Sequence, residues 1–108
     1  MVNIHPSLLP AFTGLDTHRR ALEAKASEHG ASVHFVTADV DGGPVIVRAR
    51  LPVTHDDTPA GLAERVLRLE HRIYPLALRW FAEGRVRKQG DAVVFDGRPL
   101  DAPLEYEA

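Results

Sequence analysis

A long amphipathic pattern in the second half of the chain constrains the fold most. From Leu62 to Trp80, large apolar residues recur at spacings of three and four, which predicts one buried face of an α-helix. Thr58 followed by Pro59 is a strong start signal, because threonine can cap a helix and proline at its first position loses no needed hydrogen bond. Pro75 should kink or interrupt the helix, since it removes a backbone hydrogen bond.

Two runs before this helix alternate between apolar and polar residues, as strands do. In residues 32–37, Val33 and Phe35 share one face. In residues 45–53, the apolar residues share a face and the arginines at positions 48 and 50 take the opposite one, most simply as a solvated surface. The two runs predict an antiparallel pair.

A shorter helix is predicted before these strands. Residues 17–28 are rich in alanine, leucine, glutamate and arginine, which favour helix. Asp16 is a suitable N-cap and Gly30 a suitable stop at the other end. The helix should therefore fill most of the interval between the opening segment and the first alternating run.

The residues after the long helix predict a small hairpin. Residues 85–89 and 92–95 alternate, and Gly90-Asp91 forms a two-residue turn between them. The tail from Pro99 to Ala108 is expected to be loose. Together the elements predict an α/β fold class, with a mixed sheet that includes an antiparallel hairpin and packs on a long helix.

Length and charge limit the classes of function. With 108 residues, 44% of them hydrophobic, residues 1–108 are expected to form one unit with one modest core. A formal net charge of −2 gives no basic field for nucleic acid or anionic lipid, so neither is expected as a partner. Small molecules are the expected ligands.

The absence of cysteine removes further options. It excludes disulfides and thiolate metal sites, and none of the six histidines lie at an i,i+4 spacing, so no metal cofactor is expected. The sequence contains no apolar run of about 20 residues, and it begins without a signal-peptide pattern. A cytoplasmic location is the expectation.

The opening segment carries most of the functional signal. Asn3 and His5 flank Ile4 in an extended stretch that Pro6 terminates. Alternation points the amide and the imidazole to the same side, at the lip of a sheet, where α/β enzymes gather their chemistry. A lone histidine after a strand is more often structural, so this pattern alone is a hypothesis.

A second polar loop joins the two alternating runs. Asp41 is followed by Gly42 and Gly43, which permit close approach of a ligand to the backbone. On its own this is a common turn sequence. His34 and Asp41 could nevertheless converge with His5. We expect His34 and His18 to orient a loop or satisfy a buried hydrogen bond.

Five stretches together resemble a known family. They are residues 3–10, 14–23, 29–37, 39–44 and 70–76. They are similar to the folate-dependent formyltransferases, and in particular to the phosphoribosylglycinamide formyltransferase (GAR transformylase) family. The resemblance covers the whole chain. It implies the C-terminal half of the formyltransferase fold, with the N-terminal half and its glycine-rich phosphate loop absent.

The resemblance implies formyl transfer from 10-formyltetrahydrofolate, a co-substrate, to the amine of glycinamide ribonucleotide in purine synthesis. It assigns catalytic roles to Asn3, His5 and Asp41, and contact with the ribonucleotide to Glu70. The folate-binding positions that it implies are Val36, Thr37, Ala38 and Asp41. No metal is implied.

These roles fit the chemistry of formyl transfer. The amide of Asn3 and a protonated His5 would stabilise the oxygen that becomes negative in the tetrahedral species, and Asp41 would favour the charged imidazole and order a water that carries the proton. Without the phosphate loop, the chain is expected to be weakly active or inactive alone. A complementary N-terminal half is therefore a possible partner.

Two alternatives stay open at this stage. The chain could be a non-catalytic fragment or interaction module that forms a homo-oligomer through an exposed sheet edge. It could also be a formyltransferase for another amine, but residues 70–75 and 17–19 argue against this. The lack of a basic surface argues against a tRNA substrate.

Overall fold

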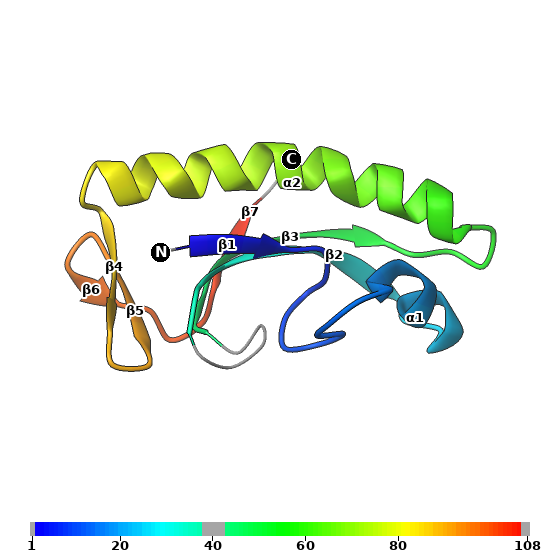
Figure 1. The fold of residues 1–108 in the computed structure, drawn as a ribbon, viewed down its shortest axis with the longest axis horizontal. Helices are drawn as coiled ribbons and strands as arrows, with labels where there is room; N and C mark the ends of the chain where they lie inside the picture. The colour runs from blue at the N-terminus through cyan, green and yellow to red at the C-terminus, as the bar shows by residue number, and fades with distance from the viewer. Residues whose placement is uncertain (1, 38–42, 107–108) are drawn as a thin grey trace.

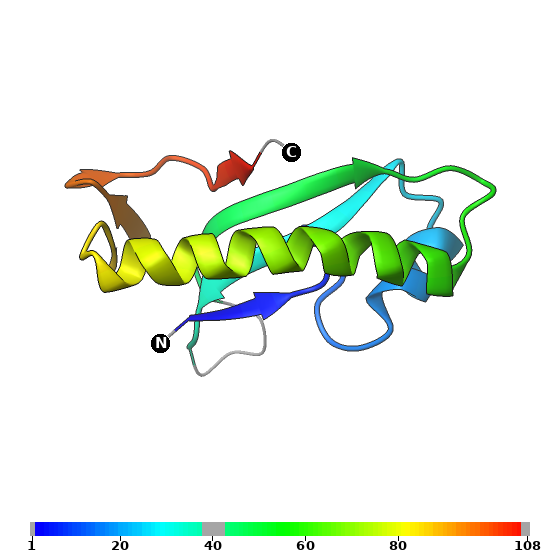
Figure 2. The same cartoon turned by 90° about the horizontal axis from the view of Figure 1, so that it is seen from above.

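The computed structural model describes residues 2–37 and 43–106, and these form two sheets and two helices. The longer helix lies across one face of a four-stranded sheet, and a three-stranded sheet lies beyond one end of it (Figures 1 and 2). In chain order the elements are β1 (Val2–His5), α1 (Thr17–Glu23), β2 (Glu28–Phe35), β3 (Val45–Pro52), α2 (Pro59–Ala82), β4 (Val86–Gln89), β5 (Ala92–Phe95), β6 (Arg98–Pro99) and β7 (Leu104–Tyr106).

The larger sheet has the strand order β1-β2-β3-β7 and is mixed. The pairs β1/β2 and β2/β3 are antiparallel, as predicted for the two alternating runs, while β3 and β7 are parallel. Val33 pairs with Val47 and His34 with Val45, so Ile46 is an extra residue that forms a bulge. The bulge lets both Ile46 and Val47 contribute to the core. The predicted fold class is confirmed.

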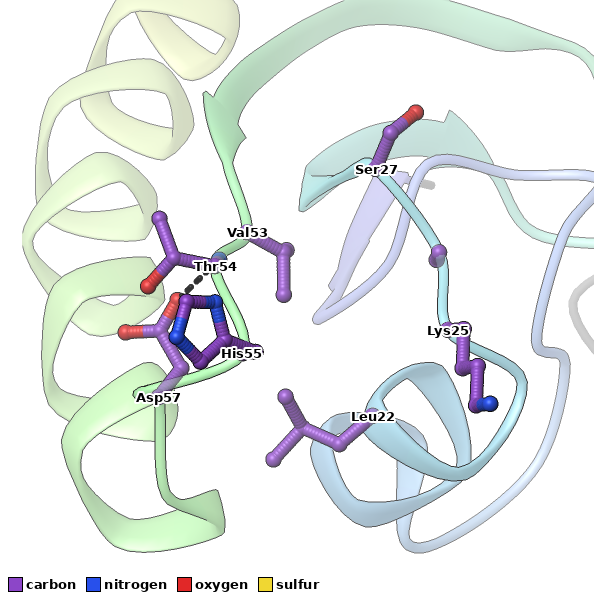
Figure 3. Close-up of a pocket in the computed structure, with 8 residues that line it drawn as sticks. Leu22, Lys25, Ser27, Val53, Thr54, His55 and Asp57 are labelled. Carbon is purple, nitrogen blue, oxygen red and sulfur yellow. Dashed lines mark hydrogen bonds between the residues drawn. The ribbon is translucent and has the colours of Figure 1, made fainter.

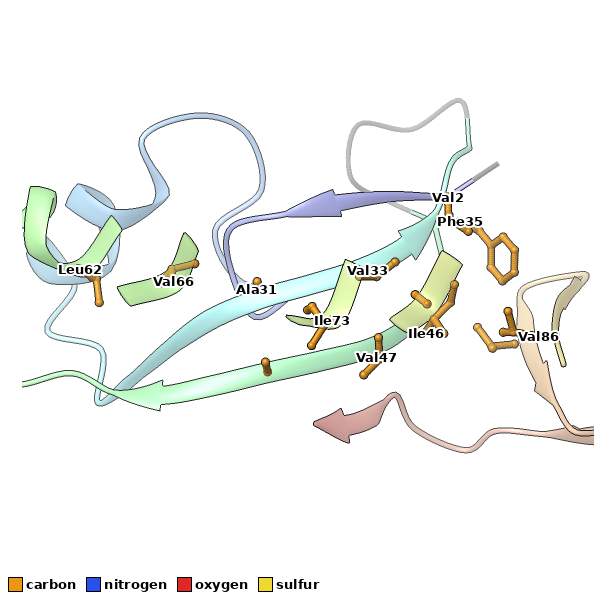
Figure 4. Packing of buried hydrophobic residues seen from close by; sticks show 13 residues of the cluster. Val2, Ala31, Val33, Phe35, Ile46, Val47, Leu62, Val66, Ile73 and Val86 are labelled. Carbon is orange, nitrogen blue, oxygen red and sulfur yellow. The ribbon is translucent and has the colours of Figure 1, made fainter. Parts of the chain in front are cut away.

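Helix α2 begins as predicted, because the hydroxyl of Thr58 accepts a hydrogen bond from the backbone N–H of Gly61 at 3.1 Å. Its apolar face packs on the sheet, with Leu62 and Ile73 fully buried (Figure 4). Of the kink or interruption predicted at Pro75, the interruption is wrong, since the helix continues to Ala82. Pro75 is exposed, so water can bond the carbonyl group that its missing N–H leaves unpaired.

The short helix ends earlier than predicted. Helix α1 stops at Glu23, and Gly30 lies inside β2 rather than at a helix end. A Cβ at Gly30 would collide with the carbonyl oxygen of Ala49 on β3, so the glycine serves close strand pairing. Asp16 holds the N-cap position, but its side chain makes no capping hydrogen bond.

The hairpin of β4 and β5 confirms the prediction, whereas the tail is not loose up to Tyr106. Strand β7 extends the main sheet beside β3, and Glu105 bonds the arginines of that strand. Its carboxylate accepts from Arg48 Nε at 2.9 Å and from Arg50 Nε at 2.8 Å. The two arginine side chains, which were predicted to form only a solvated surface, thus hold the C-terminal strand against β3. Ion pairs across separate segments leave little trace in a sequence.

Replacing Glu105 with glutamine should loosen β7. We expect a loss of about 0.5–1 kcal/mol, because these ion pairs are only partly buried. Amide hydrogen exchange at Leu104 and Tyr106 should quicken about two- to fivefold, which is that energy expressed as a ratio. Glu64→Gln, which breaks an exposed pair with Arg68, is the matched control. Unchanged exchange in β7 would contradict the fastening role.

Candidate active site

The predicted pair on β1 is brought to one face of the sheet. Asn3 lies opposite His34 and His5 opposite Ser32 on β2. Ile4, between them, packs against the core on the side that α2 covers. Because side chains alternate along a strand, the amide of Asn3 and the imidazole of His5 project from the opposite side. Asn3 is exposed, and His5 is buried.

The imidazole of His5 is held by a backbone carbonyl that the sequence did not point to. Its Nε2 lies 2.8 Å from the carbonyl oxygen of Phe12. A carbonyl only accepts, so Nε2 carries the hydrogen of this bond. The geometry fixes the orientation of the ring and places a hydrogen on Nε2.

The loop after His5 is fastened to the outer face of the sheet. The hydroxyl of Ser32 donates to the carbonyl of Ser7 at 2.7 Å and accepts from the backbone N–H of Leu9 at 3.0 Å. Thr17 donates to the carbonyl of Pro6 at 2.6 Å. Sequence analysis missed these anchors, although knowledge of the strand register would have placed Ser32 opposite His5.

Glu70 lies on the other side of β1, in a groove of about 440 Å³. It is half-buried, and burial raises the pKa of its carboxyl group, while the charges of His71 and His5 act in the opposite direction. The groove is lined by Ile4, Leu67, Glu70, His71, Tyr74 and Pro75.

The predicted folate-binding segment is only partly described. Val36 and Thr37 follow the end of β2, with the side chain of Val36 exposed. Gly43 returns so close that a Cβ on it would collide with the carbonyl oxygen of Phe35, and Phe35 donates its N–H to Pro44 at 3.0 Å. The base of the segment thus lies beside the start of β1, where Val2 pairs with Phe35. Ala38 and Asp41 lie outside the described residues.

Three other histidines occupy structural positions near this face. His18 Nδ1 lies 3.2 Å from His29 Nε2, and His34 Nδ1 lies 2.9 Å from the carbonyl oxygen of Phe35. These contacts agree with the loop-orienting and bond-satisfying roles expected of His18 and His34. Within residues 2–37 and 43–106, no group of three or more histidine, aspartate or glutamate side chains could hold a metal ion.

His29 should make the stability of the chain depend on pH. Burial, followed by the charges of His18 and His5, lowers the pKa of His29 to about 4 from 6.5. Protonation then favours the unfolded state, so stability is full above pH 6.5 and falls as the pH drops towards 4. From pH 7 to pH 5 we expect a loss of about 2 kcal/mol in urea unfolding. His29→Gln should flatten this slope and His55→Gln should keep it. An equal slope in His29→Gln would refute the assignment.

A larger groove of about 610 Å³ lies elsewhere, between the end of α1 and the segment that leads into α2 (Figure 3). Leu22 and Val53 form apolar walls, and Thr54 donates its backbone N–H to Asp57 at 2.8 Å. None of the predicted site residues that the structure describes line it.

In the described part of the chain, no helix is both long and apolar enough to cross a bilayer.

Comparison with known proteins supplies the family. Residues 1–78 match the family model described as formyl transferase. The chain belongs to the formyl transferase family. Over all 108 residues it is 52% identical to phosphoribosylglycinamide formyltransferase of Escherichia coli (strain K12), of which it covers 50%. It is also 49% identical to the human trifunctional purine biosynthetic protein adenosine-3 over 87 residues. These residues make up 81% of this chain and 9% of the human protein.

Solved structures of the formyl transferase family share the fold. The phosphoribosylglycinamide formyltransferase of Coxiella burnetii matches 99% of this chain with a TM-score of 0.94 and 54% identity, over 51% of its own length. A formyltetrahydrofolate deformylase of Pseudomonas syringae matches 87% of the chain, over 32% of its own length, with a TM-score of 0.82 and 30% identity. The predicted resemblance is confirmed, and the chain spans about half the length of its bacterial phosphoribosylglycinamide formyltransferase relatives.

Proposed function

We propose that the chain carries the reacting face of a phosphoribosylglycinamide formyltransferase. The reaction is formyl transfer from 10-formyltetrahydrofolate to the amine of glycinamide ribonucleotide in purine synthesis. The observation that carries the proposal is the placement of Asn3 beside a carbonyl-fixed His5 on one face of β1, in a chain 52% identical to such an enzyme.

Each of these side chains has a chemical task in the proposal. As the amine attacks, the formyl oxygen becomes negative, and the amide N–H of Asn3 and a protonated Nδ1 of His5 stabilise it. The amine must then lose a proton, and the folate nitrogen must gain one as its bond to the formyl carbon breaks. A water ordered by Asp41 provides a route for this proton. Glu70 accepts hydrogen bonds from the ribonucleotide. The roles of Asp41 and Glu70 follow from the family resemblance.

The residues at the end of β2 suit a folate. Val36 offers an exposed apolar side chain, and the hydroxyl of Thr37 is buried with no hydrogen-bond partner among the described residues. A flat heterocycle could pack on the exposed side chain of Val36. We include Ala38 and Asp41 in this binding segment on the family resemblance, and no metal takes part.

We further propose that a complementary half completes the site. Strand β1 lies at one end of its sheet, and α2 exposes Leu67, Leu78 and Phe81. An open strand edge beside apolar side chains favours a further strand and helix over solvent. The part of the relatives that this chain does not span supplies them in the proposal, together with the phosphate-binding energy that orients the substrate amine. The chain alone is then weakly active or inactive.

The acceptor of the formyl group tests the proposed reaction. We would mix the chain with the half of the Escherichia coli relative that it does not match, then supply 10-formyltetrahydrofolate with and without glycinamide ribonucleotide. Formylated ribonucleotide is the expected product. Release of formate whether or not ribonucleotide is present would instead favour the deformylase chemistry named for the Pseudomonas relative.

A non-catalytic homo-oligomer is the second candidate, favoured by the same open edge of β1. Sedimentation of the pure chain separates the two, because the edge of one copy can pair with the edge of another. A stable dimer that refuses the complementary half and binds no folate would support this candidate against the enzyme.

A further inference from the structure

The turn that presents the Phe12 carbonyl to His5 has an unfavourable backbone conformation. Phe12 has a φ of 53° and Asp16 a φ of 56°, both in the left-handed region, which aspartate tolerates but phenylalanine rarely adopts. Gly14, between them, has a φ of 85°. Such a segment persists only where surrounding contacts hold it in place. A side chain outside the turn must therefore hold it.

Arg20 on α1 makes the contacts that this turn requires. Its Nη1 donates to the carbonyl of Thr13 at 2.6 Å and to the carbonyl of Leu15 at 2.9 Å. Its guanidinium carbon lies 5.7 Å from the centre of the Phe12 ring, within the range of a cation–π contact. One side chain therefore contacts the ring of the residue that bonds His5 and the carbonyls that follow it.

Arg19, the neighbouring arginine, makes different contacts from Arg20. Arg19 is paired with Asp16 at 3.1 Å and with Glu23 at 3.8 Å, both on the exposed surface of α1. It therefore has the same charge in the same helix without these contacts to the turn. Residues 6–11 have separate anchors in Thr17 and Ser32, so loss of Arg20 should release the turn and leave those anchors in place.

We propose that Arg20 is a positioning residue that acts on the formyl transfer through His5. It holds the turn that carries the Phe12 carbonyl, and that carbonyl holds the His5 ring in place with a hydrogen on Nε2. The relevance to turnover rests on the proposed function. The effect on the imidazole rests only on contacts within this chain.

Ring-nitrogen NMR of the ¹⁵N-histidine-labelled chain tests the inference without any partner. In the parent chain, His5 should show the tautomer with hydrogen on Nε2. In Arg20→Gln its two nitrogen shifts should move towards each other, as the tautomers mix, whereas Arg19→Gln should keep the parent pattern. Parent-like His5 shifts in a folded Arg20→Gln chain would overturn the proposal. If Arg20→Gln does not fold, Arg20→Lys is judged by the same criterion, since lysine cannot bond both carbonyls with the planar arginine geometry.

Turnover of the completed enzyme, which is the chain mixed with its complementary half, is a separate readout. Arg20→Gln should lower kcat by roughly 10- to 100-fold with little change in KM, because a misplaced catalytic group slows the chemical step. A changed tautomer with no turnover in any sample would refute the proposed function and leave the positioning contact intact. An unchanged tautomer with normal turnover would refute the positioning role of Arg20 and leave the proposed function intact.

Discussion

His5→Ala should reduce formyl transfer by the completed enzyme about 10²- to 10⁴-fold, the usual contribution of a positioned acid or base. The loss should be in kcat, because the imidazole acts on charge that develops during the reaction rather than on binding of the ground state. Steady-state rates of the mixture of the chain and its complementary half, with saturating substrates, measure this effect.

His55→Ala is the matched control for that experiment. The side chain of His55 is 93% exposed and paired with Asp56, so its removal should leave the rate within about twofold. Equal rates for the His5→Ala mixture and the parent mixture would remove His5 from the chemistry. The catalytic role assigned to Asn3 would then be lost as well, because the alternation of the same strand singled out both residues.

Leu62→Ala should destabilise the chain by about 2–5 kcal/mol. Leu62 is fully buried where α2 begins to cross the sheet, so the substitution removes buried methyl groups and leaves a cavity. Leu15→Ala makes the same chemical change at a side chain that is 86% exposed and should shift stability by less than about 0.5 kcal/mol. Urea unfolding measures both. Similar losses in the two variants would contradict the packing of α2 on the sheet.

The elements that the sequence predicted well are those set by local chemistry. Thr58 and the apolar stripe placed α2, and alternation placed the β2 and β3 pair with its core face. The errors came from long-range contacts. Gly30 resembles a helix stop until the carbonyl of Ala49 is seen against it, and Glu105 belongs to a strand because two distant arginines bind it.

The candidate site divides in the same way. Alternation and the family resemblance singled out Asn3 and His5, and the structure places them on one face of β1. The carbonyl of Phe12 could not be predicted, because every residue carries a carbonyl and only the folded turn aims this one. Asp41 stays a prediction, since it lies outside the described residues.

The proposed function gives this chain half of a formyltransferase site and makes its activity depend on the other half. Its most direct test is the rate of ribonucleotide formylation by the chain alone, by the complementary half alone and by their equimolar mixture. We predict turnover only in the mixture, and its loss when the chain carries His5→Ala. Full activity of the chain alone, or a stable complex of the two halves with no turnover, would contradict the account.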